Sequence, residues 1–201
     1  MSITVQKKLI LASSSPRRQE LIRSLQLPYE IRVSDVNEDT EPGLRPDEIV
    51  EQLSSRKALA VCEMYKKEHR TDGIVIGSDT IVVVDGEVLG KPKDKQDAFR
   101  MLNSLQGRKH EVFTGVACID LSTGQQLVSH HVTSVYMKTL TPTQIERYID
   151  TGEPMDKAGS YGIQGLGATI IERIDGDYFN VVGLPVSLLS DLLERLGIAV
   201  L

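Results

Sequence analysis

The chain has 201 residues, of which 40% are hydrophobic and 25% are charged, proportions typical of a globular protein. A chain of this length can bury about 70% of its unfolded surface, which suits one α/β domain or two closely packed lobes. It carries 23 Lys and Arg against 28 Asp and Glu, a net charge of −5, which argues against a general nucleic-acid binder. A polyanionic ligand would therefore be held locally, by a few cations in a cleft.

The sequence has no stretch of 18 apolar residues and no signal-peptide pattern at its N-terminus, so we expect a cytoplasmic protein with no membrane association. Cys62 and Cys118 are too few and too far apart for a disulfide framework or a zinc site. We expect both to be reduced thiols in the core.

The first predicted elements are a buried strand over residues 8–12, a tight turn and a helix. An apolar run ends in three serines, and apolar residues then resume at helical spacing. Ser15 is the natural N-cap, and Pro16 fits the first helical position, where its missing N–H costs nothing.

Two arginines occupy the first turn of this helix, where acids are usual. The exposed N–H groups there already amount to about half a positive charge, so Arg17 and Arg18 are unfavourable unless an anion lies between them. We therefore predict a phosphate site made by these arginines and the hydroxyls of the preceding serines. The alternative is that both guanidinium groups lie in solvent.

The next segment alternates as a strand over 29–34 and continues into an acidic loop over 35–43. The loop could hold a cation or be a solvated turn. A long amphipathic helix is predicted over 46–64, with Lys57 on its apolar face and Arg56 pointing elsewhere. Lys57 is a candidate anion contact, and the alternative is that its ammonium group extends to the edge of the apolar stripe.

The most apolar run of the chain, residues 74–84, is rich in β-branched residues and predicts a central strand. Asp79 interrupts it, and an unpaired carboxylate is costly to bury, which favours a catalytic or cation-binding role. A hairpin turn at 85–86 leads into a short returning strand over 87–89. Lys91 follows as a loop cation that we expect near Asp79.

The rest of the chain alternates helices and strands around one glycine-rich stretch, residues 156–167. The glycine order differs from that of a dinucleotide-binding fingerprint, so we interpret the stretch as a loop whose backbone approaches a ligand closely. The other predicted elements are a helix that ends at Gly107, strands at 112–120 and 126–138 around a turn, a helix over 141–151, a strand over 168–174, a turn at 175–177 and a final helix over 186–196.

Three stretches together resemble the Maf family of nucleoside triphosphate pyrophosphatases: LASSSPRR at 11–18, GSDT at 77–80 and AGSYGIQG at 158–165. The likeness extends to residues 56–58, 91–92 and 180–185 and so spans nearly the whole chain. One departure lies in the acidic loop, where the family usually has Ile-Asp-Glu and this chain has Val-Asn-Glu at 36–38. Only Glu38 of this loop carries over as a metal ligand.

The resemblance implies an α/β fold of the Maf and ITPase type, with a central mixed, twisted sheet, helices on both sides, and two lobes that flank a nucleotide-binding cleft. It implies one Maf-like domain over residues 1–201, in the cytoplasm and commonly as a homodimer, with no nucleic-acid or membrane partner. It also implies a divalent metal, Mg²⁺ or Mn²⁺, with Glu38 and Asp79 as the ligand pair.

The implied reaction is attack of water on the α-phosphate, which releases pyrophosphate and a nucleoside monophosphate, with Asp79 as the base. Arg17, Thr80 and Gln164 look like the branch that acts on dTTP and UTP, and modified pyrimidine nucleotides stay open as substrates. The implied substrate-binding residues are Ser13, Arg17, Arg18, Lys57, Thr80, Lys91 and Gln164. The alternative function is a nucleotide-binding regulator of septum formation and cell division with little turnover, which would need no general base at Asp79.

Overall fold

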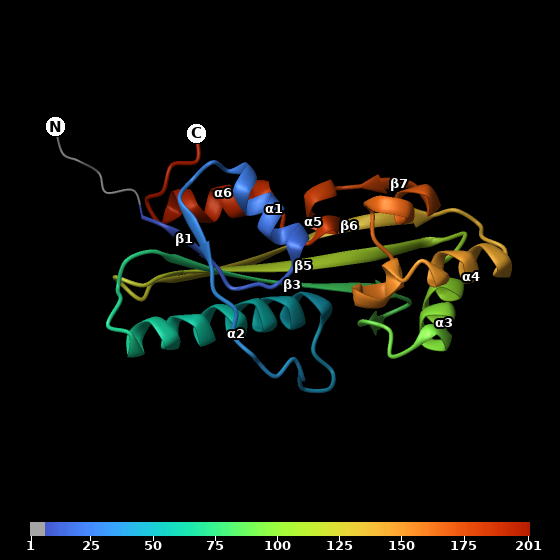
Figure 1. Ribbon diagram of the computed structural model, residues 1–201, viewed down its shortest axis with the longest axis horizontal. Helices are drawn as coiled ribbons and strands as arrows, with labels where there is room; N and C mark the ends of the chain where they lie inside the picture. Colours follow the sequence, from blue (N-terminus) through green and yellow to red (C-terminus); the bar gives the residue numbers. More distant parts are fainter. Residues whose placement is uncertain (1–6) are drawn as a thin grey trace. The chain divides into compact units, whose positions relative to one another are not determined.

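The β-branched run at 74–84 forms the strand predicted for it, β3 (Ile74–Val84), in which all but one residue is buried. The computed structural model describes residues 7–201, and it contains a seven-stranded sheet in the order β2-β1-β3-β5-β6-β7, with β4 paired to β3 (Figure 1). β1 pairs in parallel with β2 and β3, whereas β4 and β7 pair antiparallel with β3 and β6. The predicted mixed α/β sheet is confirmed.

The remaining strands and the helices follow the predicted order closely. The strands are β1 (Leu9–Leu11), β2 (Tyr29–Ile31), β4 (Glu87–Leu89), β5 (Lys109–Asp120), β6 (Gln126–Met137) and β7 (Ile171–Asp175). The α-helices are α1 (Pro16–Ser24), α2 (Pro46–Lys67), α3 (Lys95–Leu105), α4 (Pro142–Asp150), α5 (Tyr178–Val182) and α6 (Val186–Arg195). The 3₁₀ helices are η1 (Glu153–Asp156), η2 (Ala158–Ser160) and η3 (Gly165–Ile170).

The chain divides into two compact units. Of the described residues, the first contains 7–79, 115–130 and 183–201, and the second contains 80–114 and 131–182. The strands β3, β5 and β6 contribute to both. Whether the whole chain acts as one domain, and whether a cleft binds nucleotide, stay predictions.

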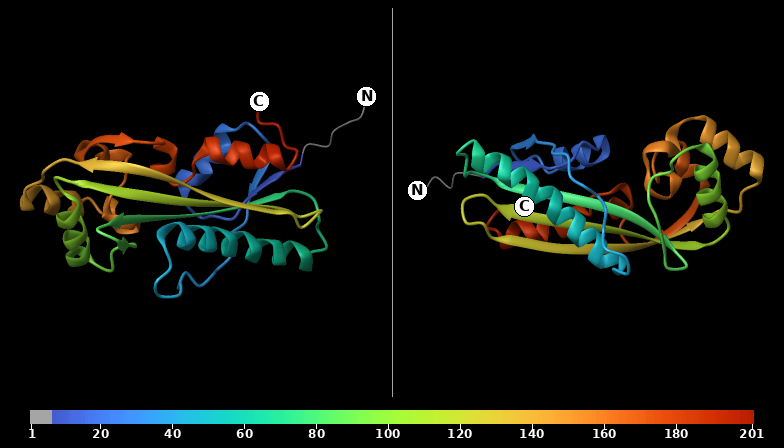
Figure 2. Two further views of the ribbon diagram at one scale, coloured as in Figure 1. Left: turned by 180° about the vertical axis from the view of Figure 1, so that it is seen from behind. Right: turned by 90° about the horizontal axis from the view of Figure 1, so that it is seen from below.

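In the first unit, α1 and α6 cover one face of the sheet and α2 covers the other (Figures 1 and 2). The apolar stripe of α2 packs on the strands through a cluster of small and branched side chains, because its apolar residues recur at the helical period. The buried members are Ile10, Ala12, Ala58, Val61, Cys62, Tyr65, Val75, Ala117 and Ile119. Cys62 and Cys118 are buried free thiols, as predicted.

In the second unit, α3 and α4 lie side by side, as the right-hand view of Figure 2 shows. Their apolar faces close a second core with the strands and with the glycine-rich stretch. It includes Val82, Leu89, Met101, Leu102, Leu105, Val112, Met137, Ile145, Ile149 and Tyr161. Among the helices of residues 7–201, none combines the length and apolar character needed to cross a membrane.

Two local expectations were wrong or incomplete. The predicted strand at 168–174 begins only at Ile171, because residues before it wind into η3, where the Thr169 hydroxyl donates to the carbonyl of Leu166 at 2.7 Å. The short helix α5 was not predicted, since five residues are too few to show a helical period. The carboxylate of Asp177 accepts a hydrogen bond from the amide of Phe179 at 2.8 Å and thereby starts this helix.

Two glycines let α2 lie unusually close to the sheet. A methyl carbon on Gly77 of β3 would lie 2.1 Å from the Ser54 carbonyl oxygen and 2.9 Å from the Ala58 amide nitrogen. One on Gly115 of β5 would lie 2.2 Å from the Val50 carbonyl oxygen. Such separations are impossible for a real side chain, so the helix could keep its place only above glycine.

We therefore expect Gly77→Ala and Gly115→Ala each to lower the free energy of unfolding by about 1–3 kcal/mol, the usual cost of overpacking a core. Urea denaturation measures the change. Gly90→Ala is the matched control, because a methyl group there meets nothing within 4 Å. Equal unfolding midpoints for Gly77→Ala and Gly90→Ala would contradict the packing described.

Candidate functional site

The turn between β1 and α1 has the predicted form. Ser15 is the N-cap with Pro16 at the start of α1, and the first turn contains no acidic residue. The hydroxyl of Ser13 accepts a hydrogen bond from the Ser15 amide at 3.2 Å, and Ser13 is buried. Arg17 lies partly exposed in this first turn. The helix end therefore keeps the positive character on which the predicted anion site depends.

Arg18 points into the protein. Its Nε donates to the Gly183 carbonyl at 2.7 Å and its Nη1 to the Ser78 carbonyl at 2.9 Å. The Ser78 hydroxyl donates to the same Gly183 oxygen at 2.9 Å. Burial lowers the pKa of Arg18, and the carboxylate of Asp79 partly offsets this effect. Arg18 thus ties β3, immediately before Asp79, to the segment that precedes α6, and the solvent alternative does not hold for it.

Asp79 shares a lysine with Glu38. The Lys57 Nζ lies 2.5 Å from Asp79 Oδ1 and 2.8 Å from Glu38 Oε1. The Asp79 and Lys57 side chains are only 10% and 15% exposed, whereas Glu38 is 56% exposed. The costly buried carboxylate is therefore paired, and the lysine ammonium is directed at two carboxylates instead of open solvent.

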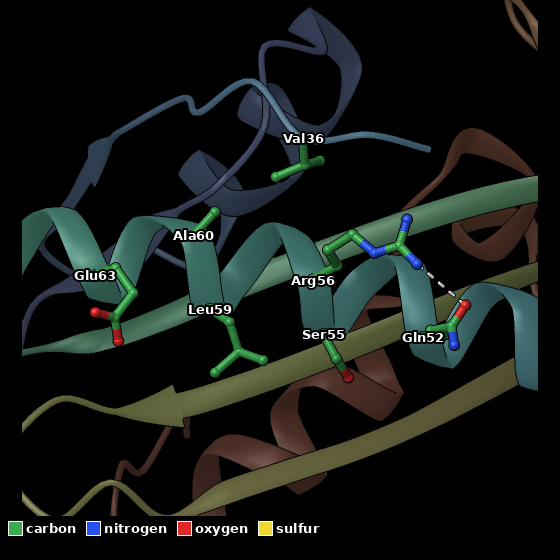
Figure 3. A pocket seen from close by; sticks show the side chains of 7 residues that line it. All are labelled: Val36, Gln52, Ser55, Arg56, Leu59, Ala60 and Glu63. Carbon is green, nitrogen blue, oxygen red and sulfur yellow. Dashed lines mark hydrogen bonds between the residues drawn. The ribbon is translucent and has the colours of Figure 1, made fainter. Parts of the chain in front are cut away.

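The acidic loop is held against α2 by a residue whose role the sequence did not indicate. Arg56 Nη1 donates to the carbonyls of Asn37 and Asp39, the latter at 2.8 Å, on either side of Glu38. Figure 3 shows Arg56 extending along the helix, where it also contacts the Gln52 side chain at 3.3 Å. Arg56 and Lys57 are adjacent in α2. Arg56 therefore positions the loop, and Lys57 pairs with its Glu38 carboxylate. The sequence gives no signal for this contact, because the contact depends on where the acidic loop folds back onto α2.

A hollow of about 510 Å³ lies beside these residues on the surface of α2 (Figure 3). It is lined by Val36, Gln52, Ser55, Arg56, Leu59, Ala60 and Glu63. None of the predicted site residues is among them. The hollow therefore adjoins the loop that carries Glu38 but shares no lining residue with the predicted site.

The donor set suits a divalent cation. Two carboxylates, Glu38 and Asp79, converge on one cationic group, the Lys57 ammonium. Across residues 7–201, no group of three or more His, Cys, Asp or Glu side chains gathers in metal-binding geometry. Mg²⁺ prefers oxygen ligands and keeps several waters, so one or two protein carboxylates suffice. The pair therefore fits Mg²⁺ or Mn²⁺ better than a metal that needs a closed protein cage.

Three predicted substrate-binding residues belong to the second unit. Thr80 follows Asp79 directly in β3, and its hydroxyl lies 2.9 Å from that of Thr114, which donates to the Asn180 carbonyl. Lys91 is exposed in the loop after β4. Gln164 is partly buried and immediately precedes η3. Their substrate contacts stay predictions.

The fold and these contacts define an α/β protein in which the positively charged N-terminal end of α1 lies near two carboxylates, Glu38 and Asp79, that share the Lys57 ammonium. A family model described as "Maf-like protein" matches residues 8–196, and the chain belongs to the Maf family. The resemblance inferred from the three motifs is confirmed.

Curated relatives match over nearly the whole chain. A protein of Desulforamulus reducens named dTTP/UTP pyrophosphatase is 54% identical over 194 residues, which cover 96% of this chain and 99% of that one. A protein of the same name from Caldanaerobacter subterraneus is 51% identical and covers 94% of this chain and 88% of its own. Among solved structures, a nucleoside-triphosphatase / dITP/XTP pyrophosphatase of Mycobacterium abscessus is 16% identical, with a TM-score of 0.43 and coverage of 94% and 96%. The family assignment does not depend on that structure.

The contacts of Arg18 generate a stability prediction. Arg18→Lys removes the planar guanidinium group that donates to two carbonyls. A buried acceptor left unpaired costs about 1–3 kcal/mol, so the free energy of unfolding should fall by this amount and the urea midpoint with it. Arg23→Lys is the control in the same helix, because Arg23 is exposed. Its effect should stay within about 0.5 kcal/mol. Equal losses in the two variants would mean that the Arg18 contacts contribute nothing beyond those of a surface arginine.

Proposed function

We propose that the protein is a nucleoside triphosphate pyrophosphatase that hydrolyses dTTP and UTP, or modified pyrimidine nucleotides, to the monophosphate and pyrophosphate. The observation that carries the proposal is Asp79, a nearly buried carboxylate paired with Lys57 and adjacent to the backbone that Arg18 holds. The names of the relatives, at 54% and 51% identity over nearly the whole chain, support the same activity.

In the proposed reaction, the oxygen of a water molecule attacks the α-phosphorus and the bond to the β-phosphate breaks. Pyrophosphate leaves, and the water's proton passes to the carboxylate of Asp79. The positive end of α1, Arg17 and Arg18 offset the charge on the phosphate oxygens, as Lys57 and Lys91 do from their own elements. Ser13 shapes the turn in which these groups meet the triphosphate.

Glu38 and Asp79 would hold Mg²⁺ or Mn²⁺. When bound, the metal supplies positive charge to the phosphate oxygens and to the attacking water. Lys57 then has a second role, because its ammonium lies between both carboxylates, offsets part of their negative charge and can also contact the triphosphate. The positive charge of the Lys57 ammonium reduces the repulsion between the two carboxylates and a bound triphosphate.

We further propose a cytoplasmic homodimer made of one Maf-like domain, with a nucleotide as its partner and no nucleic acid or membrane. The net charge of −5 supports this choice of partner, since a chain with a net negative charge lacks the excess of Lys and Arg with which proteins bind nucleic acid in general. The dimer and the location rest on the family resemblance.

Asp79→Asn should lower kcat by roughly 10²–10⁴-fold, the usual contribution of a general base, because the amide keeps the shape but loses the basicity. Pyrophosphate release from UTP in the presence of Mg²⁺ measures the effect. The control is Asp72→Asn, an exposed position before β3 that should leave kcat unchanged.

A kcat for Asp79→Asn within about threefold of wild type would exclude Asp79 as the base. Absence of turnover with every nucleoside triphosphate, by the wild type itself, would overturn the proposed activity and favour a nucleotide-binding regulator.

The base preference is proposed to depend on Gln164. Uracil and thymine present an N3–H donor beside the O4 acceptor, which match the carbonyl and NH₂ of one glutamine amide, whereas cytosine inverts the pattern. Gln164→Ala should abolish the preference for UTP over CTP, and Gln164→Glu should narrow it, because a carboxylate cannot donate to O4. The ratio of kcat/KM values for the two nucleotides is the measurement. Gln125→Ala, in an exposed turn, is the control and should leave that ratio unaltered. If the ratio is also unaltered in both Gln164 variants, Gln164 takes no part in base recognition.

A further inference from the structure

Glu153, the first residue of η1, holds the segment that follows Gln164. Its Oε2 accepts a hydrogen bond from the amide of Leu166 at 3.0 Å, and its Oε1 accepts one from the amide of Gly167 at 2.8 Å. Both carboxylate oxygens are thus directed at backbone N–H groups of η3. One side chain therefore fixes the two peptides that begin two residues beyond Gln164.

Tyr148 of α4 holds the segment on the other side. Its hydroxyl donates to Glu153 Oε1 at 2.9 Å and accepts a hydrogen bond from the amide of Gly162 at 3.3 Å. Gly162 precedes Gln164 by two residues. The pair formed by Tyr148 and Glu153, here called the loop brace, therefore makes hydrogen bonds to the backbone on both sides of Gln164.

The glycines of this segment are explained by the loop brace. A methyl carbon on Gly165, which has a φ of +64°, would lie 2.7 Å from Glu153 Oε2. One on Gly167 would lie 2.0 Å from the Gly162 carbonyl oxygen and 2.6 Å from the Tyr148 hydroxyl oxygen. The sequence was interpreted as a loop whose backbone approaches a ligand, and that approach stays a prediction. In the structure, Gly165 is required by the approach of Glu153, and Gly167 by the approach of the Gly162 carbonyl and the Tyr148 hydroxyl.

The charge states suit this role. Burial alone would raise the pKa of Glu153, but hydrogen bonds from Gly167, Leu166 and Tyr148 lower it below its usual value. The carboxylate is therefore ionised near neutral pH and accepts on both oxygens. Burial raises the pKa of Tyr148, so its hydroxyl stays protonated and can donate.

A second buried contact anchors the residue next to Gly162. The Tyr161 hydroxyl and His110 Nε2 lie 2.6 Å apart, and both residues are buried. Burial lowers the pKa of His110 to about 4, so the ring is neutral near pH 7. Tyr161 is therefore fixed to β5 while the loop brace fixes its neighbours, which leaves little freedom to the backbone that carries Gln164.

We propose that Glu153 is a positioning residue that, together with Tyr148, holds the backbone of Gln164 in one place and thereby sets the preference for bases with an N3–H group over cytosine. This inference rests on the proposed function. A mobile loop would let the Gln164 side chain shift to meet the edge of cytosine as well, whereas a fixed backbone limits the positions from which its amide can reach the base and leaves polar groups unpaired against cytosine.

The test compares Glu153→Gln and Tyr148→Phe with wild type. Glu153→Gln keeps the size of the side chain but replaces one acceptor oxygen with a donor, and Tyr148→Phe removes only a hydroxyl. Each should lower the UTP-to-CTP ratio of kcat/KM by about fivefold or more, the lower end of the penalty for an unpaired polar group. Glu146→Gln, an exposed acid on α4, should leave the ratio unchanged.

A double mutant separates positioning from general loss of stability. In a Gln164→Ala background, Glu153→Gln should cause no further change in the ratio, because the effect passes through Gln164. Hydrogen exchange at the amides of Leu166 and Gly167 should also accelerate in Glu153→Gln. Tyr148→Phe keeps the test valid if Glu153→Gln fails to fold.

The outcomes are distinguishable. A wild type that prefers UTP, with the same preference in Glu153→Gln and Tyr148→Phe, overturns the positioning role and leaves the proposed function intact. A lower melting temperature with an unchanged ratio would overturn it too, since it would show a purely structural contact. A wild type that hydrolyses no nucleoside triphosphate would overturn both proposals.

Discussion

The structure of the first unit depends on how closely α2 approaches β3. At Gly77 the helix backbone lies where any side chain would stand, and the Ser54 to Ala58 segment rests directly on the strand. Lys57 belongs to that segment, and Asp79 lies two residues beyond Gly77. The short distance between the Lys57 ammonium and the Asp79 carboxylate follows from this packing, because a raised helix would leave a buried acid without its partner.

The same packing arranges opposite charges around the middle of β3. Arg18 holds the carbonyl before Asp79, Lys57 pairs with the carboxylate itself, and Arg56 holds the loop that brings Glu38. A group of this kind is stable only if each charge has a partner, since leaving one unpaired in a buried place costs several kcal/mol. Under the proposed function, this group is where the metal cation and the triphosphate would bind together.

Much of the fold could be predicted from the sequence, because apolar period, N-caps and turns are local signals. β3 and the start of α1 lie where Ile74–Val84 and Pro16 placed them. One failure has its origin outside the predicted strand: η3 replaced the first part of that strand, and Glu153, from another segment, accepts hydrogen bonds from the η3 amides of Leu166 and Gly167. Of the site, Asp79 and Lys57 could be singled out because each is costly in an apolar setting.

The sequence by itself determined the order of the elements, the membership of the Maf family and the residues whose chemistry suits a phosphate ligand. Only the tertiary structure decided which of these groups meet: that Lys57 pairs with both Asp79 and Glu38, that Arg18 turns inward to two carbonyls, and that the glycines around Gln164 make room for Glu153 and Tyr148. The physical reason is that hydrogen bonds and ion pairs act over about 3 Å, whereas their partners are separated by up to 165 residues in the chain, so only packing can bring them together.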